Sequence, residues 1–230
     1  MELEVYVGPL VRFYLDDWEN AERRAAREAG RPPAPPPEDA ITDPAEVAEI
    51  VELWRQDLAK ALGRHASVAL DWAEEPMGPY ATGQPTWAAY VDLLLWAAYE
   101  EHPELPRPAS SVADLANDPA YKLSSSQGSG TRYPHLLGCQ WWLPVDIPFT
   151  FMAHDPAGKR MAFGSSPRLL SELSWLNSAT WQADEPTLAA WRAAGRADAT
   201  LESGARFALA LLADLGRTAV ARRHVMKLDY

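Results

Sequence analysis

The two ends of the chain alternate between apolar and polar residues. Residues 2–7 place Leu3, Val5 and Val7 on one side, and residues 224–230 do the same with Met226, Leu228 and Tyr230. A period of two is typical of a β-strand with one buried face. We therefore predict a strand at each end and expect the last strand to pair with the first.

Apolar residues at helical spacing fill much of the remaining chain. Residues 86–101 are apolar on nearly all sides, which is typical of a helix buried in a core. At about 16 residues this segment is too short to span a bilayer. The pattern predicts helices at 10–29, 44–62, 86–101, 167–176, 186–194 and 201–221, and a short helix at 111–117.

The densest strand signals lie in the middle of the chain. Trp141–Leu143, Phe149–Ala153 and Arg160–Phe163 are short aromatic and aliphatic runs, and residues 154–159 between the last two contain Asp, Pro and Gly. Such a turn sequence predicts a β-hairpin near 149–163. Ser166 is placed to cap the helix that follows.

Two further segments have a recognisable local character. Residues 31–44 contain six prolines, which favours an extended connector between two helices. Pro33 and Pro36 also satisfy a bare P-x-x-P ligand pattern, so that alternative stays open. Ser67–Trp72 has the composition of another strand.

Composition indicates one folded domain. The 230 residues are 47% hydrophobic and include ten Trp, which is enough to build a core. We predict an α+β fold, a mainly α-helical single domain (1–230) with a small antiparallel sheet made of the hairpin and the terminal strands. The Pro-rich connector at 31–44 lies within this domain.

Several features favour a cytoplasmic protein. Cys139 is the single cysteine, so no intramolecular disulfide can form. The chain shows no basic and apolar leader and no run of about 18 apolar residues. We therefore expect no contact with a membrane. Abundant Ala and Arg, with only four Lys, suit a GC-rich bacterial genome.

The negative charge is concentrated in one half. The net charge is −11, and residues 1–107 hold 21 acidic and 9 basic side chains. Nucleic acid binding needs clustered Lys and Arg, so we expect no nucleic acid partner. Glu46, Glu49, Glu52 and Asp57 share one face of the helix predicted at 44–62. That face is either an ordinary solvated surface or a docking surface for a basic protein.

No strong catalytic motif is present. His135 and Cys139 have the chemistry of a base and a thiolate nucleophile, and Asp146 and His154 flank the same predicted sheet. The His residues lack metal-ligand spacing, so we predict neither a metal nor a cofactor. The polar loop Ser124–Thr131 resembles a phosphate cradle in composition but lacks the P-loop ending.

Three classes of function follow from these observations. The first is an acidic protein-binding domain, in concrete form an immunity protein that neutralises a basic bacterial toxin. The second is a small-molecule enzyme whose residues converge around the central sheet. The third is an oligomerising module that uses an exposed strand edge.

Overall fold

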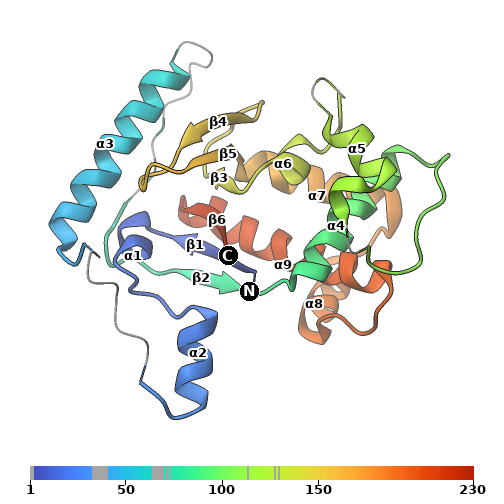
Figure 1. The fold of residues 1–230 in the computed structure, drawn as a ribbon, viewed down its shortest axis with the longest axis horizontal. Helices are drawn as coiled ribbons and strands as arrows, with labels where there is room; N and C mark the ends of the chain where they lie inside the picture. Colours follow the sequence, from blue (N-terminus) through green and yellow to red (C-terminus); the bar gives the residue numbers. More distant parts are fainter. Residues whose placement is uncertain are drawn as a thin grey trace.

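The computed structural model describes residues 3–32, 41–63, 70, 72, 74–112, 114–126, 128 and 130–230, and it places helices on both faces of a central sheet (Figure 1). The sheet has the order β2-β1-β6-β3-β5-β4. Its strands are β1 (Glu4–Gly8), β2 (Ala81–Gly83), β3 (Trp141–Leu143), β4 (Phe151–His154), β5 (Arg160–Ser165) and β6 (Val225–Asp229). The α+β class is confirmed.

The sheet is larger than the small antiparallel sheet we predicted. The terminal strands do pair antiparallel, with Val5 opposite Leu228 and Val7 opposite Met226. However, β3 and β5 run parallel, so the sheet is mixed. The reason is that β4 lies outside β5, at the edge, instead of between β3 and β5.

The predicted hairpin is confirmed. The backbone N–H of Asp155 donates to the carbonyl of Lys159 over 2.8 Å, and the Asp155 carboxylate accepts from the Lys159 N–H over 2.8 Å. The helix after the hairpin is capped one residue earlier than predicted. The hydroxyl of Ser165, not Ser166, accepts from the N–H of Arg168, because Ser166 is already helical.

One face of the sheet carries the larger helical layer, seen on the right of Figure 1. Within it, α4 and α9 pack closely, and Gly204 leaves room for the buried carboxylate of Asp92. The layer consists of α4 (Trp87–Glu101), the 3-10 turn η1 (Leu115–Asn117), α5 (Pro119–Ser125), α6 (Pro134–Gly138), α7 (Ser166–Thr180), α8 (Glu185–Ala194) and α9 (Leu201–Arg222). The prediction of a central buried helix at 86–101 is confirmed.

The smaller layer differs from the prediction. The expected helix at 10–29 is two helices, α1 (Leu10–Tyr14) and α2 (Ala21–Glu28). The chain breaks between them because Asp16 takes a left-handed φ of 55° and Asn20 caps α2. The third helix, α3 (Pro44–Leu62), matches the predicted bounds, and the side chain of Asp43 caps it by accepting a hydrogen bond from the N–H of Ala45.

Two predictions fall wholly or mostly outside the described residues. The P-x-x-P of the Pro-rich connector lies in the undescribed residues 33–40, and most of the strand expected at 67–72 lies in residues 64–69 and 71. Of the helices that the structure describes, none is long and apolar enough to cross a membrane.

The adjacent tryptophans Trp141 and Trp142 divide the core in two. Both rings are fully buried, on opposite faces of β3. Trp142 belongs to the core under α4, α7 and α9, whereas Trp141 packs with Phe163 and with Trp54 of α3. The alternation of a strand thus supplies one anchor to each layer.

Candidate functional site

The structure brings His135 and Cys139 together, but not as a nucleophile and its base. Both side chains flank Gly164. The Nδ1 atom of His135 accepts a hydrogen bond of 3.0 Å from the backbone N–H of Ser165, and burial lowers the pKa of His135 to about 4. Burial also raises the pKa of the Cys139 thiol. A neutral imidazole beside a protonated thiol is not an activated pair.

The other two enzyme candidates lie apart from this pair. Asp146 is exposed and forms an ion pair with Arg168, with 2.5 Å between Oδ1 and Nε. His154 is exposed at the end of β4, where its carbonyl accepts a 2.7 Å hydrogen bond from Trp54 Nε1. The four residues therefore do not line one cavity.

Two of the four acidic side chains on the predicted face of α3 form ion pairs with basic side chains of the same helix. Glu52 pairs with Arg55 over 2.5 Å, and Asp57 pairs with Lys60 over 3.0 Å. Glu46 and Glu49 are exposed, with no ion pair to another described residue. Leu53 shares this side of the helix and is 54% exposed.

The polar loop Ser124–Thr131, whose composition resembles a phosphate cradle, is hydrogen-bonded at both ends to a carboxylate. Glu101 accepts hydrogen bonds from Ser124 Oγ over 2.6 Å and from Thr131 Oγ1 over 2.8 Å. A fixed negative charge at this place opposes a phosphate. Among the described residues, no group of three His, Cys, Asp or Glu side chains could hold a metal ion.

A different cluster forms around Lys227, in the middle of the sheet. The alternation of β6 points Lys227 and Asp229 toward the smaller helical layer, and the Lys227 residue is only 6% exposed. Its Nζ lies 3.2 Å from Asp229 Oδ1, 3.4 Å from the centroid of the Phe13 ring and 5.1 Å from the centroid of Trp141. This ammonium group is thus held between one carboxylate and two aromatic rings.

Lys227 borders a cavity of about 150 Å³. The cavity is built by α1, β3, the hairpin and β6, which are far apart in the sequence. Its walls combine aromatic side chains with two lysines and two aspartates. These are Phe13, Tyr14, Trp141 and Tyr230, with Lys159, Lys227, Asp155 and Asp229.

Burial sets the protonation of this site. It lowers the pKa of Lys227 to about 8, while the nearby Asp229 and Asp155 act in the opposite direction. Lys227 is therefore still mainly an ammonium ion at neutral pH. Burial, reinforced by the charge of Asp155, raises the pKa of Tyr14, so this hydroxyl stays protonated.

Three side chains around the cavity have hydrogen-bond donors without a full set of acceptors. An ammonium group has three N–H donors, and within the described part of the chain Lys227 donates one hydrogen bond, to Asp229. The Nε1–H of Trp141 has no acceptor there, and the Tyr14 hydroxyl, although close to Asp155, lacks a well-formed hydrogen bond. Buried donors without acceptors are costly, so a ligand oxygen would find donors ready here.

The sequence gives only a faint signal of this cluster. Lys227 occupies the polar side of an alternating strand, which on a terminal strand normally faces water. That face is covered because α1 folds back over it after β1. Lysine is rare in this chain, which has four, and the only hint in the sequence was that one of them lies within an alternating strand.

Comparisons with known protein families, with curated proteins and with solved structures found no match to this chain.

Proposed function

We propose that this protein binds a small zwitterionic molecule, such as a short α-amino acid, in the Lys227 cavity. The carrying observation is the buried ammonium of Lys227, which shares one cavity with aspartates and aromatic rings. Small-molecule sites characteristically combine apolar walls with a few polar groups and a perturbed pKa.

The charges favour a ligand that carries both signs. Two lysines and two aspartates line the cavity, so a lone anion or a lone cation would meet a like charge. A ligand carboxylate can accept hydrogen bonds from Lys227, and a ligand ammonium can pair with Asp155 near the aromatic faces. The volume of about 150 Å³ equals roughly five water molecules at ~30 Å³ each, which suits a ligand of alanine-like size.

Calorimetric titration with three matched probes tests this proposal. Alanine carries both charges, lactate lacks the ammonium and ethylamine lacks the carboxylate. We expect saturable alanine binding, at least about tenfold tighter than either half-molecule, which corresponds to about 1.4 kcal/mol. Lys227→Met, with a side chain of similar length and no charge, should abolish it. Equal binding of all three probes, or none of alanine, would refute the proposal.

A second proposal keeps the protein-binding function, and the exposed side of α3 supports it. Glu46 and Glu49 have no ion pair within the described residues, and they lie on the same side as the exposed Leu53. Acidic side chains around an apolar contact suit a basic partner, because charge speeds association and the apolar side chain is desolvated in the complex. A bacterial toxin neutralised by this chain as its immunity protein is the concrete form.

This second proposal is tested by capture from a bacterial lysate at low and moderate salt, followed by charge reversal. The variant Glu46→Lys with Glu49→Lys should slow association of the captured protein and reduce its salt dependence. Glu22→Lys with Glu28→Lys on α2 makes the same change in net charge elsewhere. Identical association rates for the α3 variant and the wild type would exclude this surface.

A further inference from the structure

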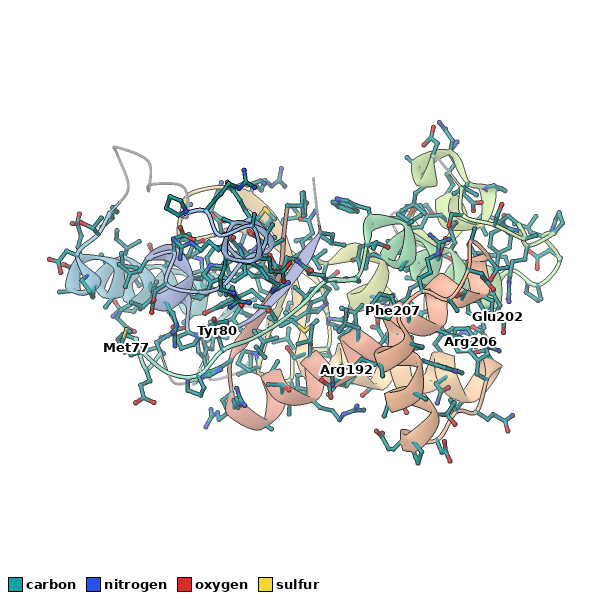
Figure 2. All side chains as sticks on the ribbon, turned by 90° about the horizontal axis from the view of Figure 1, so that it is seen from below. Met77, Tyr80, Arg192, Glu202, Arg206 and Phe207 are labelled. Carbon is teal, nitrogen blue, oxygen red and sulfur yellow. The ribbon has the colours of Figure 1, made fainter. Side chains whose placement is uncertain are left out.

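A second concave site lies on the α1 and α2 side of the molecule. Four of the nine basic residues in positions 1–107 line a single open groove of about 480 Å³. They are Arg12, Arg23, Arg27 and Arg31. Tyr80 also lines the groove, and Figure 2 shows it well away from Arg206 and Phe207 at the start of α9.

Arg12 is held in place by several contacts. The Nε of Arg12 donates to the carbonyl of Asp17 over 2.6 Å, and its Nη1 donates to the carbonyl of Gly78 over 3.1 Å. The guanidinium carbon lies 4.6 Å from the centroid of the Tyr80 ring. Arg12 is thus oriented by backbone carbonyls and an aromatic ring as well as by the carboxylate of Asp17.

The arginines of α2 follow one another along the groove. Arg23 bonds to the carboxylate and carbonyl of Asp16, and Arg27 pairs with Glu19. Arg31, just past the helix, is exposed and has no ion pair to a described residue. Each guanidinium carries five N–H donors, so one carboxylate partner leaves others available. The Arg27 side chain, 65% exposed, presents them to solvent.

This arrangement runs against the charge of the rest of the molecule. The lining holds four arginines against Asp17 and Glu19, and it is locally positive within an acidic half of the chain. A partner of phosphate type fits it, because guanidinium forks bind phosphate oxygens in a bidentate manner. We infer that this groove binds a phosphate group of a small molecule, at a site separate from the Lys227 cavity.

Titration with inorganic pyrophosphate at low ionic strength tests the inference, with citrate as a polyanion that lacks phosphorus. We expect saturable binding of pyrophosphate that citrate does not match. The double variant Arg27→Gln with Arg31→Gln should weaken pyrophosphate binding at least about tenfold, since it removes two charge-assisted contacts to the phosphate oxygens.

Two controls keep the result interpretable. Arg160→Gln with Arg222→Gln removes the same two charges from exposed positions outside the groove and should bind pyrophosphate as the wild type does. If the double variant fails to fold, Arg31→Gln alone takes its place. It breaks no ion pair with a described residue and should show a smaller loss of pyrophosphate affinity. Unchanged affinity in the groove variants, or equal binding of citrate, would overturn the inference.

Discussion

The Nζ atom of Lys227 lies 3.4 Å from the centroid of the Phe13 ring. Lys227 stands at the centre of the sheet, and Phe13 belongs to the short helix α1 directly after β1. The contact therefore joins the two ends of the chain. It also explains how a lysine can be buried with a single carboxylate partner, because the ring face attracts the cation where water is excluded.

Replacing Lys227 by Met should not destabilise the protein. The buried ammonium pays a desolvation cost, and Asp229 is exposed enough to regain water once its partner is lost. We expect the free energy of unfolding at pH 7 to stay the same or rise by about 1 to 3 kcal/mol. Urea unfolding at equilibrium measures it. A clear decrease would mean that the lysine is a net structural support.

Stability should rise with pH above about 8. The pKa of Lys227 is about 8 in the folded protein and 10.5 in its ordinary state, so between these values the unfolded chain binds more protons. Stability increases with pH wherever the unfolded state holds more protons, here by up to on the order of 3 kcal/mol. The difference between wild type and Lys227→Met in urea unfolding at pH 7.5 to 9.5 isolates this contribution. A difference independent of pH would contradict it.

Glu172 should behave in the opposite sense. Its carboxylate accepts from the backbone N–H groups of His135 and Leu136 over 3.0 and 2.8 Å, and burial raises its pKa to about 8. Between pH 4.5 and 8 the folded state holds the extra proton, so stability falls as pH rises. We expect Glu172→Gln, which keeps an acceptor for α6, to flatten this slope in urea unfolding.

Glu172→Ala is the contrasting variant. It removes both acceptors at the start of α6 and should cost about 2 kcal/mol. If the Gln and Ala variants are equally stable at pH 7, the carboxylate does not support α6.

Gly204→Ala should be strongly destabilising. A Cβ at this position would collide with the carboxylate of the fully buried Asp92, so the packing of α4 against α9 must shift. We expect a loss of about 3 kcal/mol in thermal or urea unfolding. Gly216→Ala on the same helix is the control, because its Cβ would meet only the flexible end of Leu170. Similar losses for both variants would disprove close packing at Asp92.

Cys139 should be inert in the folded protein. The side chain is buried, and burial raises the pKa of its thiol. We expect iodoacetamide to leave the native protein unlabelled and to label the same residue rapidly in urea, as measured by mass spectrometry. Rapid labelling of the native state would restore the thiolate pair of Cys139 and His135 as a candidate site.

Local patterns in the sequence determined most of the secondary structure. The alternation of residues 3–7 and 225–229, the turn at Asp155–Lys159 and the apolar stripe of α4 were all readable, because period, caps and turn residues are local properties. The predicted helix at 10–29 was wrong, since the pattern continues across a break made by a single backbone angle at Asp16.

Only the tertiary structure decided the site. From the sequence, Lys227 is expected to face solvent, but in the structure α1 covers that face of the sheet. Phe13, Trp141 and Asp155 approach Lys227 from three separate segments of the chain. The same holds for His135 and Cys139, which meet but are neutralised by burial. Burial and long-range proximity are what change a side chain's chemistry, and neither is encoded in the spacing of residues along the chain.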